Sequence, residues 1–404
     1  MNEHPIRLEV DDDLRRSRIT VFLRLPLCAP HLVWLLLWGI AAAVAGLANW
    51  LATLVRGRSP LVLHRFLVAY IRYALHVSAF AFLGANPFPG FTGSGPYPID
   101  VAIAPPERQG RWRVAFRPIL VVPALLVASE LAGRSPLAPV FGVGGAVATV
   151  AVLAWFAALT RGRMPAGLRD LIAYSLRYAA QMTAYLVCVT AVYPNADPAA
   201  DRPARRPAAV DVVVADDLRR SRVTVFFRVL LAIPHLIWLY LWSIAVWFLA
   251  PIAWLVTLID ARPPEFFAGF YSSFLRYQTH VVAYLTLVAN PYPGFLGRAG
   301  SYPDDLVVDT GERQNRWTIG FRIILAIPAA GVTSALAGPA FAVGFLGWFA
   351  CLVTGRMPTG LRNLGAYALR YAAQTGAYML LLTDRYPDSG PWLTVAGGEP
   401  AVGD

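Results

Sequence analysis

Long apolar runs most restrict the fold of this 404-residue chain. Leu25–Val55 and Leu230–Ile259 contain no Asp, Glu, Lys or Arg, and Leu364–Leu382 contains one Arg. An apolar run of about 18 residues or more is typical of a helix that crosses a membrane. The composition agrees, because only 15% of the residues are charged and the mean hydropathy is +0.52. We therefore predict an all-α polytopic membrane protein.

The charge of the chain narrows the class of partners. The net charge is +11, and no Lys is present, so the positive charge comes from Arg. The arginines are spread over the whole chain without a recognition motif, which argues against nucleic-acid binding. A basic membrane protein favours contact with anionic headgroups. The predicted partners are the lipid bilayer, with anionic lipids among them, and an unidentified membrane protein.

The two halves of the chain repeat at an offset of 204 residues. Leu14–Arg18 recurs as Leu218–Arg222, and Asn86–Phe91 recurs as Asn290–Phe295 with Tyr in place of one Phe. Self-similarity of this kind is the signature of a repeated structural unit.

Each half consists of two related quarters. In every quarter an Arg precedes a Pro by six residues, a Trp comes before an Arg-x-Pro turn, and an Arg-Tyr pair begins fourteen residues after the turn Arg. The four sets are Arg24, Pro30, Trp50, Arg58 and Arg72; Arg117, Pro123, Trp155, Arg163 and Arg177; Arg228, Pro234, Trp254, Arg262 and Arg276; Arg322, Pro328, Trp348, Arg356 and Arg370. We predict repeat units at 1–98, 99–195, 210–303 and 304–390, a polar linker at 196–209 and a disordered tail at 391–404.

Each quarter has the same predicted order of elements. A short alternating segment predicts a β-strand outside the bilayer. An Arg-bearing interfacial helix then ends at the shared Pro, which kinks or breaks it. A spanning helix follows, ends near the Trp, and is joined by the turn to a second spanning helix. About twelve extra residues near Glu130–Pro139 predict a longer loop in the second quarter. The predicted strands are Ile6–Val10, Ile99–Ile103, Val210–Val214 and Leu306–Val308.

Two span counts are compatible with this order. An interfacial segment before each span gives eight spans, which we favour, whereas helical hairpins give up to twelve. With eight spans the strand-bearing loops and both termini share one face. We expect that face to be the cytoplasmic side of the plasma membrane, because Arg202, Arg205 and Arg206 lie in the linker.

Several segments resemble a catalogued family. Phe227-Arg228 leading to Pro234-His235, the run Thr354–Pro358, the pair Arg370-Tyr371 and the ending Leu382–Pro387 are similar to the bacterial membrane family catalogued as domain of unknown function 4389. The resemblance covers nearly the whole chain as tandem copies. It implies fold and location, and no catalytic residues, because the family has no assigned activity.

The candidate site consists of polar pairs one helical turn apart in the second helices. Spacing i, i+4 places both side chains on one helix face. Such faces could line a polar path or bind an anionic headgroup, and the alternative is that each Arg reaches the headgroup level or a neighbouring carbonyl. The candidate intramembrane residues are Arg72 with His76, Arg177 with Gln181, Arg276 with His280, and Arg370 with Gln374.

Other polar residues give weaker hypotheses. His31, His76, His235 and His280 could ligate haem or a metal, or relay protons, but an interfacial or hydrogen-bonded role is the simpler expectation. The acid–Arg clusters that precede the first helices predict helix caps and surface ion pairs, with lipid or partner binding as the alternative. Cys28, Cys188 and Cys351 show no disulfide or zinc spacing. We predict no catalytic residue, cofactor or metal.

Three functions stay open at this point. A non-enzymatic scaffold, or module that interacts with lipid or a partner, is the leading hypothesis. A small-solute or ion transporter or channel is the alternative, since internal repeats are common among transporters. A haem or metal redox membrane protein is the third.

Overall fold

The computed structural model describes residues 4–133, 144–200, 210–214, 216–303, 305–309 and 312–395. These residues form fourteen helices and five short strands, so the predicted mainly helical fold is confirmed. The chain divides into two compact units, Met1–Asn195 and Ala196–Asp404. Each unit therefore contains two quarters, which are the odd and the even quarter of that unit.

The first quarter consists of a short helix and an antiparallel pair of long ones. These are α1 (Arg18–Phe22), α2 (Arg24–Arg56) and α3 (Leu61–Ala81). Pro30 lies inside α2, so the prediction that it ends a helix was wrong. Proline is tolerated within apolar helices where neighbouring groups satisfy the freed carbonyl. The helix also continues six residues beyond Trp50, and its 33 residues span about 50 Å at 1.5 Å per residue.

Glycine ends α2 and permits the turn to α3. Gly57 has a φ of +68°, in the left-handed region, which glycine adopts without steric cost. Gly162 and Gly355 occupy the same conformation after α7 (Gly145–Arg161) and α13 (Arg322–Thr354). In the third quarter Ala261 takes this place with a φ of +56°. Three turns thus use the favoured residue and one does not.

The second quarter interrupts its long helix. Its elements are α4 (Arg111–Ala115), α5 (Arg117–Leu120), α6 (Val122–Ala132), α7, and α8 (Ala166–Leu186). The end of α6 and the start of α7 lie close together, because a Cβ on Gly133 would lie 2.2 Å from the carbonyl oxygen of Gly144. The predicted longer loop falls mainly on residues 134–143, which lie outside the described residues.

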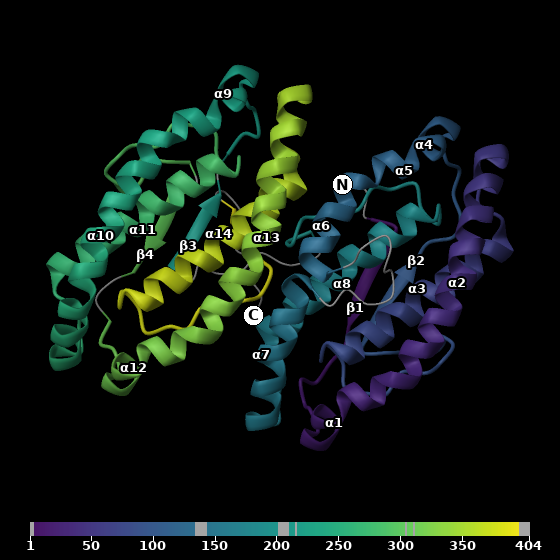
Figure 1. The fold of residues 1–404 in the computed structure, drawn as a ribbon, viewed down its shortest axis with the longest axis horizontal. Helices are drawn as coiled ribbons and strands as arrows, with labels where there is room; N and C mark the ends of the chain where they lie inside the picture. The colour runs from purple at the N-terminus through teal and green to yellow at the C-terminus, as the bar shows by residue number, and fades with distance from the viewer. Residues whose placement is uncertain are drawn as a thin grey trace, which may run out of the picture. The chain divides into compact units, whose positions relative to one another are not determined.

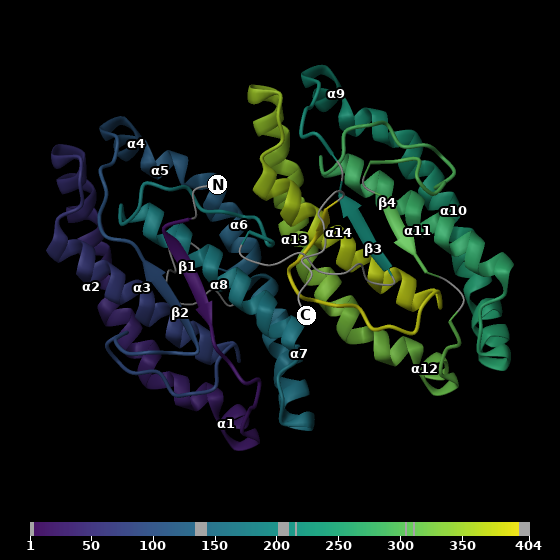
Figure 2. The same ribbon diagram turned by 180° about the vertical axis from the view of Figure 1, so that it is seen from behind.

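The two quarters of the first unit pack against each other through their second helices and their strands. Helices α3 and α8 pack together, with α2 against α3 and with α6 and α7 against α8 (Figure 1). The strands β1 (Ile6–Val10) and β2 (Ile99–Ile103) pair antiparallel, as Figure 2 shows, and their predicted bounds are confirmed. Each strand packs on the second helix of the other quarter: β1 on α8, and β2, which opens the second quarter, on α3.

The long helices of the two quarters run in opposite directions. The backbone of Arg15, before α1, forms an antiparallel β-bridge with that of Arg163 after α7. A second bridge joins Arg58, after α2, to Arg108 before α4. The first helices therefore begin at opposite ends of the unit. Each strand lies in a connection that leads from one end of the unit toward the other. That all strand-bearing connections share one face of the membrane stays a prediction. We call the end with Arg15 the odd end and the end with Arg108 the even end.

The second unit repeats the arrangement with an unbroken fourth long helix. Antiparallel pairing of β3 with β4 joins its quarters as in the first unit. The segment predicted as a disordered tail from residue 391 contains β5, which pairs parallel with β3, and residues after 395 lie outside the described residues. The elements are β3 (Val210–Val214), α9 (Arg222–Phe226), α10 (Arg228–Asp260), α11 (Glu265–Leu285), β4 (Asp305–Val308), α12 (Arg316–Gly320), α13, α14 (Thr359–Met379) and β5 (Thr394–Val395).

Among the described residues, three helices are long and apolar enough to cross a membrane: α2, α10 and α13. Only 11% of the most apolar window of α10 is buried within the chain. The third long apolar helix is thus α13 and not the predicted run Leu364–Leu382, most of which lies in the buried helix α14. Helices α6 and α7 are apolar but shorter.

Candidate functional site

A buried arginine closes the C-terminal end of every second helix. Arg117 donates from Nη1 to the carbonyl oxygens of Tyr185 and Thr190, each at 2.8 Å, and its guanidinium lies 4.3 Å from the Tyr185 ring centroid. The last carbonyls of a helix lack partners and carry the negative end of the helix dipole, which this cation neutralises. The equivalent arginines are Arg24, Arg228 and Arg322, each 2% exposed.

These arginines were visible in the sequence only as repeat markers. They precede the shared proline by six residues, a spacing that gave no hint of their partners. Each reaches a helix end about 60 residues further along the chain, as in Arg228 to Ala289 at 3.1 Å. Their role is to fasten the first helix of a quarter to the end of the second.

The predicted pairs of the odd quarters contact aspartates at the strands. His76 Nε2 lies 2.9 Å from Asp100 Oδ1, and Arg72 Nε donates to the same oxygen at 3.0 Å. His280 lies 2.9 Å from Asp305, while Arg276 donates to the carbonyl of Leu306 at 3.0 Å. The Arg–His pair of an odd quarter therefore fixes a strand to its helix.

The glutamines of the even-quarter pairs make neutral bonds to strand carbonyls. Gln181 donates to the carbonyl of Ile6 at 3.0 Å, and Gln374 donates to that of Val210 at 2.9 Å. Arg370 donates to the carbonyl of Gly390 at 2.6 Å and lies 4.4 Å from the Trp392 ring. Arg177 is buried with its guanidinium over the Tyr174 ring.

Hydrogen bonds shift the titration of both strand aspartates. Burial alone raises the pKa of Asp100, but hydrogen bonds from His76 and Arg72 outweigh it and hold this pKa well below its usual range. Burial likewise acts against the bond from His280 at Asp305, and the net pKa is again lowered. Both carboxylates are therefore ionised at neutral pH.

The other two predicted histidines, His31 and His235, lie in aromatic surroundings. His31 Nδ1 is 2.8 Å from the Tyr73 hydroxyl, and the rings of Phe88 and Phe91 each lie 4.5 Å from its own ring. His235 repeats this arrangement with Tyr277. The four predicted histidines thus have two kinds of partner, Tyr for His31 and His235 and Asp for the other two.

The metal and disulfide hypotheses can be compared with the geometry of the described residues. Within these residues no group of three or more His, Cys, Asp or Glu side chains could hold a metal ion. The three cysteines are buried and free. The described part of the site therefore contains hydrogen-bond and ion-pair chemistry, with polar side chains used to join elements.

The repeats and the long apolar helices define a class: a tandem-repeat, mainly helical protein with membrane-like helices. The sequence profile described as "Domain of unknown function (DUF4389)" matches residues 18–92, 136–196, 222–297 and 316–389. The chain belongs to this family, in four tandem copies, and the predicted resemblance is confirmed. No curated protein and no solved structure matches the chain.

Proposed function

We propose that the protein is a multi-pass plasma-membrane scaffold that contacts lipid through its long helices and has no catalytic activity. The observation that carries this proposal is the distribution of polarity over α2. One stripe of α2, with members such as His31 and Asn49, is buried against the chain, while Leu25, Val33 and Val44 on its other faces are each more than 60% exposed. Lipid is the environment that accepts such a surface without cost.

The other long helices support the same environment. Trp247 and Phe248 on α10 are 72% and 64% exposed, and Phe341 on α13 is 75% exposed. Apolar surface of this extent on one helix after another exceeds what a water-soluble monomer exposes. The short helices add exposed aromatic groups such as Trp112 and Trp317, which suit the headgroup level.

The packing of the helices supports the view that they cross the membrane in antiparallel pairs. Arg24 at the start of α2 contacts Phe80 at the end of α3, and Asn49 near the other end bonds Ser59. If α2 crosses the membrane, α3 crosses with it. Four such pairs give the eight spans, with the quarters of each unit in inverted orientation. The strand-bearing side of each unit then faces water or protein, because lipid cannot satisfy strand edges.

A scaffold role fits the use of polar groups better than a permeation role. Seven of the eight candidate residues bond strands or loops of their own unit, and Arg177 stacks on the Tyr174 ring, so the set orders the fold. The inverted quarters are the one observation that favours a transporter, since that symmetry is common among them. The polar pairs give no support to a permeation path.

Two measurements test this proposal. Alkaline carbonate should leave the protein in the membrane pellet, and only detergent should release it. Reconstituted liposomes should show the ion and solute leak of protein-free liposomes. Release by carbonate would contradict the membrane location, and a protein-dependent flux would replace the scaffold with the transporter.

A further inference from the structure

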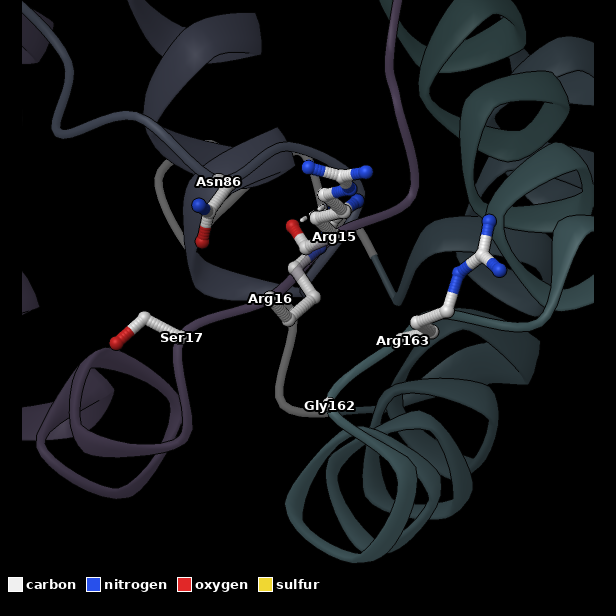
Figure 3. A pocket seen from close by; sticks show the side chains of 6 residues that line it. All are labelled: Arg15, Arg16, Ser17, Asn86, Gly162 and Arg163. Carbon is white, nitrogen blue, oxygen red and sulfur yellow. Dashed lines mark hydrogen bonds between the residues drawn. The ribbon is translucent and has the colours of Figure 1, made fainter.

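We propose that the cavity at the odd end of the first unit binds the phosphate group of an anionic phospholipid, and that an equivalent site exists in the second unit. This inference rests on the proposed membrane location. The cavity has a volume of about 450 Å³ and contains three arginines. Figure 3 shows Arg15 and Arg16 between Ser17 and Asn86 on one side and Arg163 on the other.

Backbone bonds hold the two arginine-bearing segments together. The Arg16 N–H donates to the Gly162 carbonyl at 3.0 Å, and the Met164 N–H donates to Leu14 at 2.8 Å. Leu14 adopts a φ of +60° to make this connection, which is costly for a side chain that branches beyond Cβ. The arginines therefore belong to a fixed frame that two quarters build jointly.

The charges of the cavity are not balanced from within. Arg16 is buried and bonds Asp12 and the carbonyls of Leu83 and Gly84. Arg15 and Arg163 are exposed, and neither side chain has a carboxylate partner among the described residues. The nearby Asp13 accepts the Arg15 backbone N–H at 2.9 Å. Two guanidinium groups thus remain for an external anion, and phosphate is the anion that arginine matches best.

The surface beside the cavity indicates a lipid as the source of that phosphate. Helix α1 follows directly after Ser17 and exposes Ile19 by 74% and Phe22 by 68%. Cationic groups beside exposed apolar side chains suit a molecule with an anionic head and apolar chains. Soluble phosphate would gain nothing from this apolar neighbour.

The second unit repeats the frame and its apolar neighbour. The Arg220 N–H donates to Gly355 at 2.9 Å, and Met357 donates to Leu218 at 2.9 Å. The backbones of Arg219 and Arg356 form a β-bridge, as those of Arg15 and Arg163 do. Phe226 on α9 is 60% exposed in the place of Phe22. The chain thus contains two copies of the proposed site.

The even ends fill the equivalent place with their own carboxylates. Glu107 stands where the odd end has Leu14, and its Oε1 accepts from Thr190 Oγ1 at 3.2 Å and from the Ala191 N–H at 3.0 Å. In the fourth quarter Asp384 stands where the odd ends have asparagine and accepts from the Asn315 N–H at 3.0 Å. At the odd ends the carboxylates of Asp12 and Asp216 are taken up by Arg16 and Arg220. An external anion would therefore supply the charge that Arg15 and Arg163 lack.

Native mass spectrometry of the detergent-purified full chain tests the site with phosphatidylglycerol and phosphatidylcholine as probes. The wild type should retain two phosphatidylglycerol molecules. The double variant Arg15→Ala/Arg163→Ala should retain one, and addition of Arg219→Ala/Arg356→Ala should remove both, with affinity lowered about tenfold per site. The matched even-end variant Arg58→Ala/Arg108→Ala should still retain two.

A second variant separates loss of binding from loss of fold. Asn86→Asp places a carboxylate where the fourth quarter has one, so it should expel one lipid while the thermal unfolding temperature stays near that of the wild type. The site would be overturned by any of three results. Phosphatidylcholine is retained equally well, inorganic phosphate displaces the bound lipid as effectively as added lipid does, or the quadruple variant binds as the wild type does. The need for detergent is checked first, before any lipid is added. A chain that purifies without detergent would refute the membrane location and not only the lipid site.

Discussion

Odd and even quarters follow one backbone plan but place their charges differently. In the odd quarters the second helix is fixed to its strand through an ionised aspartate, such as Asp100, whereas Gln181 bonds a backbone carbonyl in the even quarter. At the helix ends, Glu107 of the even end accepts from the Ala191 N–H, whereas Asp12 of the odd end pairs with Arg16 and leaves Arg15 and Arg163 without a carboxylate partner among the described residues. Duplicated units can therefore keep their geometry while one copy leaves a charge for an external ligand.

The largest effect is expected where odd and even quarters are alike. Arg24→Ala and Arg117→Ala each remove a buried cation that donates to two carbonyls at a helix end, so each should lower the free energy of unfolding by about 3 kcal/mol. Reversible unfolding of the detergent-solubilised chain measures both. A loss at only one of the two positions would break the equivalence of the quarters.

The strand contacts should separate the two quarter types by pH. Because its folded pKa is lowered, Asp100 contributes stability that is complete above its unfolded pKa of about 4 and is lost as pH falls toward the folded value. Asp100→Asn should therefore cost about 1 kcal/mol at pH 7, and this difference from the wild type should shrink below about pH 4. Thermal unfolding across the pH range is the readout.

The matched even-quarter variant supplies the control for this pH series. Gln181→Leu removes a neutral bond to Ile6, so its cost should stay constant with pH. A cost that falls in acid for Gln181→Leu as well, or one that stays constant for Asp100→Asn, would refute the assignment of charge to the odd quarters.

The smallest expected effect concerns the turn after α10. Ala261→Gly removes the steric cost of a left-handed alanine, partly offset by the entropy that glycine loses, and should raise the free energy of unfolding by about 0.5 kcal/mol. Gly355→Ala at the matching turn should lower it by a similar amount. Opposite signs in one unfolding assay confirm the shared turn geometry, and equal signs contradict it.

Local patterns made much of the fold predictable. The bounds of β1, β2 and β3 follow from apolar alternation, and the turn at Gly57 follows from its Gly-Arg-x-Pro sequence. Pro30 misled the helix assignment, because a proline rule based on soluble helices ignores the packing that carries α2 through it. Short-range sequence therefore predicted where strands and turns lie better than whether a helix continues through a proline.

The long-range contacts of the site were beyond the sequence. The pair spacing of Arg72 and His76 identified one helix face, but their partner Asp100 lies 24 residues after His76 on a strand that opens the next quarter. The role of Arg24 and the exchange of contacts between quarters depend on tertiary packing that no spacing encodes. Identical repeat motifs also concealed that the quarters run in opposite directions.

Labelling at the two ends of the first unit tests the central claim most directly. Ser17 and Gly110 occupy equivalent exposed positions before α1 and α4, at the odd and the even end. In a background without the three native cysteines, Ser17→Cys and Gly110→Cys are exposed separately to a membrane-impermeant maleimide on sealed vesicles. The account predicts that one is labelled directly and the other only after permeabilisation. Labelling of both from the same side would contradict inverted, membrane-crossing quarters.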